Sequence, residues 1–289
     1  MEKLTIEVFT DPMMGLSYES EPVFRKLETH FGPQVEFFYR MGWLVRDVMD
    51  FVDPADLQSG KAEAIRRYNG RLARIYEEEE SIGGLPINME GFSLFSETEI
   101  SSLPLNLAYK AVERIAPEKA ERFLYLLRYA TIVETRPTTR IEEILRVTDS
   151  LPIDRKAFME AFHDKTTLEA LSEDLRAHTA LSVYTLPTYV LNYAGRSMVI
   201  PRLIGYGDFS EAIDSISLGT IRPTLPERSQ DAIFQLCEKH PLISSIEIRD
   251  AFEFSSVEEV QGFIQPLVEA GRLAVREVRG GWFIERCQE

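Results

Sequence analysis

The sequence predicts an α/β fold with a long helical middle section, followed by a smaller second domain. Two apolar, strand-like segments at residues 4–9 and 35–41 flank a helix-like segment, which is typical of a β-α-β unit with parallel strands. Helical periodicity dominates from about residue 47 to 179, and a strand-like segment returns at 183–191. A chain of 289 residues is long enough for one large domain or two smaller ones.

The composition is that of an ordinary globular protein with an acidic surface. Hydrophobic residues make up 44% of the chain and charged residues 27%, and the net charge is −15. This charge disfavours nucleic acid or an anionic membrane as the main partner. No apolar run approaches the roughly 18 residues of a membrane span. Because the chain enters a strand directly after Met1-Glu2-Lys3, we expect no signal peptide and a cytoplasmic location.

The junction between the first strand and the first helix carries a distinctive segment. The strand Leu4–Phe9 is followed by Asp11-Pro12-Met13-Met14-Gly15-Leu16-Ser17-Tyr18. The helix that opens there is expected to continue through Glu21-Pro22-Val23. Gly32-Pro33 then marks a turn before the second strand, Val35–Met41.

The middle section is predicted to form a helical insertion, at about residues 46–180, packed over one side of the sheet. The acidic run Glu77–Glu80 is expected to be a solvated helix end. Gly83-Gly84-Leu85-Pro86 should break the chain after it. The segments with apolar helical faces are 62–80, 105–115, 117–131, 140–149, 154–162 and 168–178.

The sheet is expected to resume at Val183–Leu191, which contains Pro187. A hairpin turn at 192–195, a strand at 197–200 and a closing helix at 209–216 should complete the first domain, residues 1–217. Residues 218–226, with Gly219, Pro223 and Pro226, are predicted to form a linker.

Residues 227–289 resemble a winged helix. Three helices are expected at 227–240, 244–252 and 257–270, and a hairpin turning at Gly280-Gly281 would form the wing. Residues 222–289 hold eight Lys and Arg against twelve Asp and Glu, and the would-be recognition helix 257–270 has no basic side chain. Because a duplex reader must neutralise phosphates, nucleic acid binding is disfavoured, and a protein contact or homodimerisation is favoured.

The first domain resembles the DsbA family of thioredoxin-fold proteins, particularly its cytoplasmic FrnE-like branch. The family pattern is Asp-Pro-x-Cys-x-x-Cys-Tyr followed by Glu-Pro-Val, and here Met14 and Ser17 occupy the two sulfur positions. Val-Tyr-x-Leu-Pro-Thr-Tyr-Val resembles the cis-proline strand of the superfamily, which implies a cis Leu186–Pro187 bond. The resemblance spans about residues 4–217, and further matches are Ser102-Leu103-Pro104, Ala108, Ala111, Pro117–Ala120, Phe123-Leu124, Leu127-Arg128, Val133-Glu134 and Ile144-Leu145.

The resemblance implies a thiol–disulfide oxidoreductase or isomerase, but the residues at the site cannot perform that chemistry. Disulfide exchange needs an attacking thiolate and a second, resolving thiol. The thioether of Met14 has no proton to lose, and the hydroxyl of Ser17 ionises only with an activating base. Dithiol chemistry would require cysteines at these positions, or Cys237 or Cys287 reaching the site from the second domain.

The two cysteines are interpreted as small apolar side chains, and no disulfide is expected in a reducing cytosol. The four histidines lack ligand spacing, so no metal site is predicted. They are His30, His163, His178 and His240.

Three functions remain open. The favoured one is a non-redox module that binds a peptide or protein in a groove beside the cis-proline loop, for which protease adaptors of the superfamily are a precedent. The second is a glutathione-dependent transferase or isomerase, similar to kappa-class transferases and 2-hydroxychromene-2-carboxylate isomerases, using Ser17 with glutathione as cofactor. The third is a retained oxidoreductase. The resemblance places ligand contacts at Asp11, Pro12, Tyr18, Thr185, Leu186 and Pro187.

Overall fold

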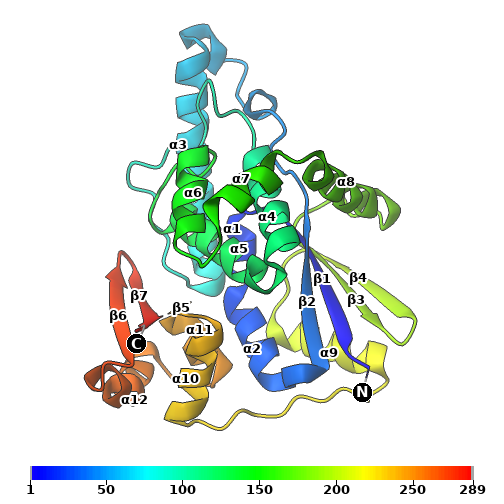
Figure 1. The fold of residues 1–289 in the computed structure, drawn as a ribbon, viewed down its shortest axis with the longest axis vertical. Coiled ribbons are helices and arrows are strands. Elements are labelled where there is room, and N and C mark those ends of the chain that lie inside the picture. Colours follow the sequence, from blue (N-terminus) through cyan, green and yellow to red (C-terminus); the bar gives the residue numbers. More distant parts are fainter. Residues whose placement is uncertain (1, 288–289) are drawn as a thin grey trace.

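The computed structural model describes residues 2–287 and contains two sheets (Figure 1). The larger sheet has the strand order β2-β1-β3-β4, and β1 pairs in parallel with β2 and antiparallel with β3. The parallel pair confirms the predicted β-α-β unit. The strands are β1 Leu4–Thr10, β2 Val35–Met41, β3 Thr188–Tyr193 and β4 Arg196–Pro201.

The first helix is broken, where the sequence predicts a continuous one. A single turn, α1 (Gly15–Tyr18), precedes α2 (Glu21–Phe31). Helices α2 and α9 (Tyr206–Ser217) pack against β3 through buried rings. The ring centroids of Phe24 and Phe209 lie 5.9 and 4.9 Å from that of Tyr189. These edge-to-face contacts form part of the core on this face of the sheet.

The insertion is helical, as predicted. Figure 1 shows its helices gathered around the carboxyl ends of β1 and β2. Asp154 and Asp164 cap two of them by accepting hydrogen bonds from backbone N–H groups of the first turn. Among residues 2–287, no helix combines the length and apolar character needed to cross a bilayer. The helices are α3 Lys61–Gly83, α4 Leu103–Ile115, α5 Pro117–Ile132, α6 Ile141–Asp149, α7 Arg155–His163 and α8 Lys165–Ala180.

The C-terminal domain has its own hydrophobic core, which includes Ile233, Cys237, Ile248, Val260 and Ile264. The three expected helices and the hairpin are present, together with a short strand, β5, that the sequence analysis does not predict. The sheet order is β5-β7-β6. The winged-helix assignment itself stays a prediction. The elements are α10 Gln230–Lys239, β5 Leu242–Ser244, α11 Ser245–Ala251, α12 Val257–Glu269, β6 Leu273–Val278 and β7 Gly281–Arg286.

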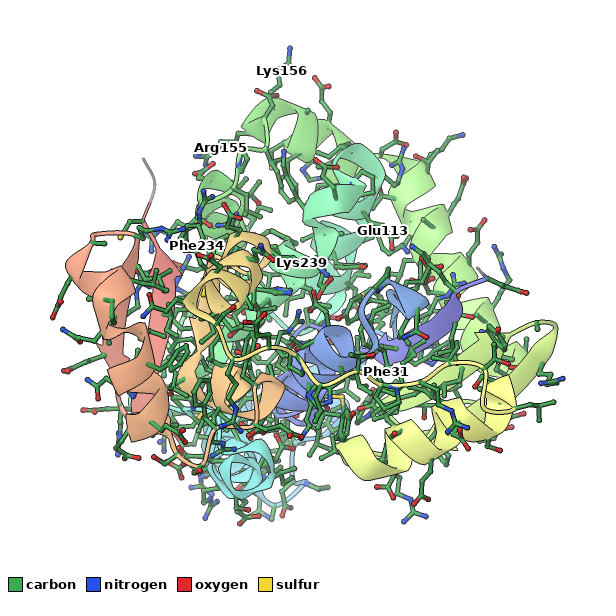
Figure 2. All side chains as sticks on the ribbon, turned by 90° about the horizontal axis from the view of Figure 1, so that it is seen from below. Phe31, Glu113, Arg155, Lys156, Phe234 and Lys239 are labelled. Carbon is green, nitrogen blue, oxygen red and sulfur yellow. The ribbon has the colours of Figure 1, made fainter. Side chains whose placement is uncertain are left out.

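The predicted linker lies against the first domain. Its residue Ile221 is buried in the larger core, and the N–H of Thr224 donates to the carbonyl of His30 at 2.7 Å. Figure 2 shows the segment passing Phe31, the last residue of α2. The connection between the two domains is therefore fastened to the end of α2.

Two buried arginines share an ion-pair network, and one of them, Arg25, links the two domains. The guanidinium of Arg25, on α2, lies 3.1 Å from Glu21, 2.8 Å from Glu121 on α5 and 3.5 Å from Glu247 on α11. The guanidinium of Arg128, on α5, lies 2.8 Å from the other carboxylate oxygen of Glu21. Because both arginines are excluded from solvent, these charges depend on one another for compensation.

We expect Arg25→Met to lower the free energy of unfolding by about 3–5 kcal/mol, because it leaves buried carboxylates without their shared cation. Urea denaturation followed by circular dichroism measures the change. Arg66→Met is the matched control, since Arg66 has 73% of its side chain exposed and pairs with the neighbouring Glu63 on the same helix. A loss in Arg25→Met no larger than in this control would contradict the assigned role of the network.

Candidate functional site

The structure brings the two predicted halves of the site to the same end of the sheet. Strand β1 ends at Thr10, just before α1. The register pairs Phe9 with Thr188, so its continuation places Pro187 opposite Thr10. The Leu186–Pro187 peptide bond is cis. A Cβ atom at Gly42 would lie 2.6 Å from the side chain of Leu186, so the absence of a side chain at position 42 permits this close packing.

The segment that would carry the dithiol is buried. Of residues 11–20, only Leu16 is partly exposed. The hydroxyl of Thr10 donates to the Ser17 hydroxyl at 2.7 Å and accepts from Arg128 at 2.8 Å. Ser17 therefore ends a hydrogen-bond chain that starts at a guanidinium. Neither Thr10 nor Arg128 can accept its proton as a general base.

Asp11 organises the loops around this segment. Its buried carboxylate accepts hydrogen bonds from the N–H groups of Met13 and Leu44 at 3.1 and 2.8 Å. It also accepts from Ser102 and Asn106 on the α4 side at 2.9 and 2.8 Å. Burial raises the pKa of Asp11, while the four hydrogen bonds oppose that rise. The carboxylate holds three chain segments together.

The predicted ligand contacts separate into buried and accessible residues. Asp11, Pro12 and Tyr18 are buried, and the Tyr18 hydroxyl donates to the carbonyl of Pro86 at 2.9 Å. Burial is the main reason that the pKa of Tyr18 lies well above its ordinary value. These three positions offer a ligand no accessible surface and instead support the local fold. Thr185, by contrast, is exposed.

The loop before β3 presents the accessible part of the site. Tyr184, which the sequence analysis does not single out, has 88% of its surface exposed, and Leu186 is half-buried. The carbonyl of Thr185 accepts from the Thr188 hydroxyl at 2.7 Å, and the carbonyl of Pro187 accepts from the Arg202 N–H. Within residues 2–287, the backbone N–H and C=O of Leu186 make no hydrogen bond.

Two carboxyl groups near α1 were not anticipated. Glu19 is buried, and one of its oxygens accepts from the N–H groups of Gly83 and Leu85 at 2.8 and 3.3 Å. Burial raises its pKa to about 8. One carboxylate oxygen of Glu79 is buried without a hydrogen-bond partner and packs against Gly15. A Cβ atom at position 15 would lie only 2.0 Å from this oxygen. Burial raises the pKa of Glu79 to about 7.

The position of Glu79 corrects the expectation that the run Glu77–Glu80 is entirely solvated. Glu77 and Glu78 are exposed, but Glu79 and Glu80 are half-buried. The Tyr76 hydroxyl, one helical turn before Glu80, donates to the carbonyl of Met13. The end of α3 therefore covers α1, and an acidic run in the sequence carries no signal of this tertiary contact.

One cluster of the described residues has the spacing of metal ligands. Oxygens of Glu28 and Glu121 and a ring nitrogen of His240 lie within 4.8 Å of one another. The guanidinium of Arg25 already contacts all three side chains, and Lys239 pairs with Glu28. We therefore interpret the cluster as part of the ion-pair network between the domains.

We expect Glu19→Gln to remove a pH-dependent loss of stability. The folded protein keeps the Glu19 proton up to about pH 8, whereas the unfolded chain releases it near pH 4.5. Below pH 4.5, Glu19 is protonated in both states and does not lower the free energy of unfolding. As the pH rises from 4.5 toward 8, the unfolded chain gains stability by releasing the proton, so the free energy of unfolding falls. Relative to wild type, the variant should gain up to roughly 4 kcal/mol at pH 8 and little at pH 4.5.

Chemical denaturation at half-unit pH steps measures this difference, with Glu78→Gln on the exposed side of α3 as control. Parallel stability curves for wild type and Glu19→Gln would show that Glu19 does not hold a proton in the folded protein.

The comparisons with known proteins agree with this geometry. The ClpXP adapter proteins SpxH of Halalkalibacterium halodurans and Bacillus subtilis are each 22% identical to the chain over 283 and 285 residues, covering 97% of it and 88% of each relative. A putative protein disulfide isomerase from Nitrosomonas europaea matches with a TM-score of 0.62 and 13% identity, over 76% of this chain and 100% of that one.

The cytosolic disulfide reductase DsbM from Pseudomonas aeruginosa matches with a TM-score of 0.54 and 19% identity, over 74% of this chain and 98% of that one. These solved structures share the DsbA-like fold. The family model described as thioredoxin matches residues 8–197. With the strand order and the helical insertion seen above, this match shows that the chain belongs to the thioredoxin family.

Proposed function

We propose that this protein is a non-redox member of the thioredoxin family that binds another protein and acts as an adaptor in the cytoplasm. The observation that carries the proposal is the dithiol position, where Met14 and Ser17 stand in a buried segment. A redox thiol must be accessible to its substrate disulfide and must form a thiolate. This position has neither property.

The cysteines of the second domain do not replace the missing pair. Cys237 lies in the core of the C-terminal domain, and burial raises its pKa to about 12. Cys287 follows β7, and its N–H donates to the carbonyl of Arg272. Both belong to the C-terminal domain, Cys237 on α10 and Cys287 after β7. This arrangement argues against an oxidoreductase.

The surroundings of Ser17 also argue against a glutathione-dependent enzyme. Its hydroxyl is buried and hydrogen-bonded to Thr10, which is held by Arg128. A serine nucleophile needs a base within hydrogen-bond reach to take its proton. Glutathione is therefore not assigned a role at this position.

The exposed edge of the cis-proline loop favours peptide binding. Among residues 2–287, the backbone N–H and C=O of Leu186 have no partner, and an extended peptide could pair with them as an added strand. Tyr184 and Thr185 would then contact the ligand side chains. In this proposal, Asp11, Pro12 and Tyr18 position the loops and do not touch the ligand.

The relatives support an adaptor function in particular. Both SpxH proteins are described as ClpXP adapters, and their alignments extend through nearly the whole chain, including the C-terminal domain. We infer that this chain also delivers a bound protein to ClpXP. The C-terminal domain, which we interpret as winged-helix-like, would serve a protein contact because α12 carries acidic and no basic side chains.

The purified protein should not reduce insulin in the presence of dithiothreitol above the rate without protein, because no accessible thiol exists at the site. Turbidity at 650 nm is a convenient measure of aggregation of the reduced insulin chains. The Cys237→Ser/Cys287→Ser variant is the control for incidental thiol reactions. Turnover that survives in this variant would contradict the non-redox proposal.

A photo-crosslinking amino acid at position 185 should yield a discrete adduct with one cellular protein, because Thr185 lies at the exposed edge of the loop. The same group at Lys156, which projects from α7 (Figure 2), is the control and should give no such adduct. The captured protein, once purified, should be degraded faster by ClpXP when the wild-type chain is added. No acceleration by the adaptor, or an equal adduct from position 156, would overturn the proposal.

A further inference from the structure

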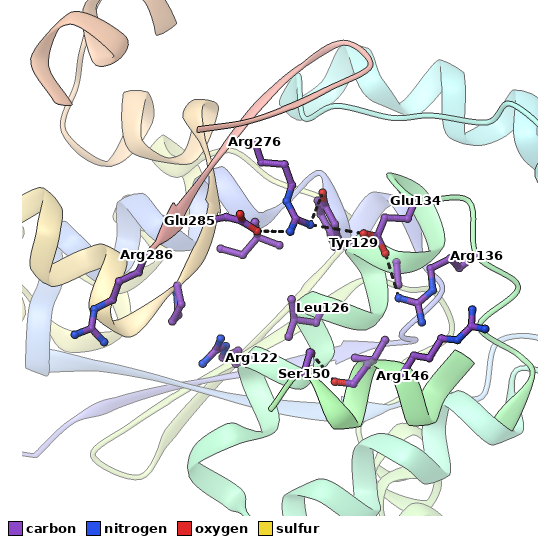
Figure 3. A pocket seen from close by; sticks show the side chains of 14 residues that line it. Arg122, Leu126, Tyr129, Glu134, Arg136, Arg146, Ser150, Arg276, Glu285 and Arg286 are labelled. Carbon is purple, nitrogen blue, oxygen red and sulfur yellow. Dashed lines mark hydrogen bonds and ion pairs between the residues drawn. The ribbon is translucent and has the colours of Figure 1, made fainter. Parts of the chain in front are cut away.

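A pocket between the two domains gathers arginines in a chain whose net charge is strongly negative. Its volume is about 380 Å³, and it lies between α5, α6 and the β6–β7 hairpin (Figure 3). This size lies within the range of small-molecule sites. Five arginines line it against two glutamates, Glu134 and Glu285. The arginines are Arg122, Arg136, Arg146, Arg276 and Arg286.

Four of the arginines have carboxylate partners. Arg276 lies 2.5 Å from Glu285 and 3.7 Å from Glu134, and Arg286 lies 3.2 Å from Glu238 outside the pocket. Arg136 and Arg146 share Glu143, which does not line the pocket, at 2.7 and 2.8 Å, and Arg136 also lies 3.1 Å from Glu134. With Glu238 and Glu143 included, four carboxylates stand against the five arginines, so one positive charge is not compensated.

That charge is Arg122. It projects from α5 into the pocket region between Leu126 and Arg286 (Figure 3). Its Nε is buried without an acceptor, and no carboxylate lies within ion-pair distance of it in the described part of the chain. Burial lowers the pKa of Arg122, and no neighbouring charge opposes this change. A half-buried guanidinium without an anion is costly unless a ligand compensates it.

We propose that this pocket binds a small, multivalent oxyanion, a phosphate-bearing or polycarboxylate metabolite, with Arg122 as its central contact. The planar guanidinium presents a fork of N–H donors that matches carboxylate and phosphate oxygens. Arg136 and Arg276 line the same pocket, and each already pairs with carboxylates, so Arg122 supplies the uncompensated charge. Since α5 and the hairpin both contribute, a bound anion joins the two domains.

The site is independent of the proposed protein-binding loop. None of its lining residues belongs to the segment 11–18 or to the loop 184–188. Failure of the anion proposal would therefore leave the adaptor proposal intact, and the reverse also holds.

Isothermal titration calorimetry of the full chain with tripolyphosphate and, separately, citrate at about 150 mM salt tests the proposal, because this ionic strength screens unspecific surface binding. We expect saturable 1:1 binding of at least one probe, and which probe binds distinguishes phosphate from carboxylate ligands. Arg122→Gln should weaken this binding at least about tenfold, which corresponds to 1.4 kcal/mol. Arg176→Gln, on exposed α8 across the molecule (Figure 1), should leave it unchanged.

Thermal unfolding without ligand separates binding from a structural role. Because Arg122 has no partner to lose, Arg122→Gln should unfold at the same temperature as wild type or higher. A clearly lower unfolding temperature would assign Arg122 to the fold and overturn the proposal. The proposal would also be overturned if neither probe showed saturable binding, or if Arg122→Gln bound the probe with the same affinity as wild type. A hexaglutamate peptide is a third probe in the same titration. If it alone bound, the pocket would take a macromolecular ligand, and the proposal would be wrong.

Discussion

The arrangement of the molecule depends on two buried guanidinium groups that share one carboxylate. Glu21 stands at the start of α2 and pairs with Arg25 on one side and Arg128 on the other. Arg128 reaches the end of β1 through Thr10, and Arg25 reaches α11 of the C-terminal domain through Glu247. Removing any one partner would leave an uncompensated buried charge, which is strongly destabilising. The C-terminal domain therefore supplies, through Glu247, one of the carboxylates that surround Arg25 of the first domain.

The segment around α1 is buried, which does not suit a reactive thiol at position 14 or 17. A thiol at position 14 or 17 would need exposure and a positive environment to ionise. Tyr76 and Glu79 contact the segment, and Glu19, directly after α1, is buried. Burial raises the pKa of Glu19 to about 8, and above that pH its negative charge would disfavour a thiolate nearby. The surroundings, and not only the two substituted positions, are unsuited to a thiolate.

The sequence predicted the elements well, because their patterns are local. The range of β2, the parallel strand pair and the helical insertion follow from apolar periodicity and turn residues. The break between α1 and α2 and the three-residue strand β5 were missed, since each is defined by tertiary contacts. The candidate site was located by its motif, but Asp11 and Tyr18 proved to be buried supports. Sequence spacing cannot distinguish a residue that lines a surface from one that lies just beneath it.

The distribution of charge indicates which kind of partner each candidate binding surface would suit. The chain is acidic overall, and α12, which would enter the major groove in a DNA-binding winged helix, has acidic residues in its first turn. The arginines that could attract phosphate are gathered in a pocket of about 380 Å³ between the domains. A duplex cannot enter a pocket of that size, because its grooves and phosphates extend over tens of ångströms. The arginine cluster therefore favours small anions, while the exposed edge at Leu186 suits an extended peptide chain.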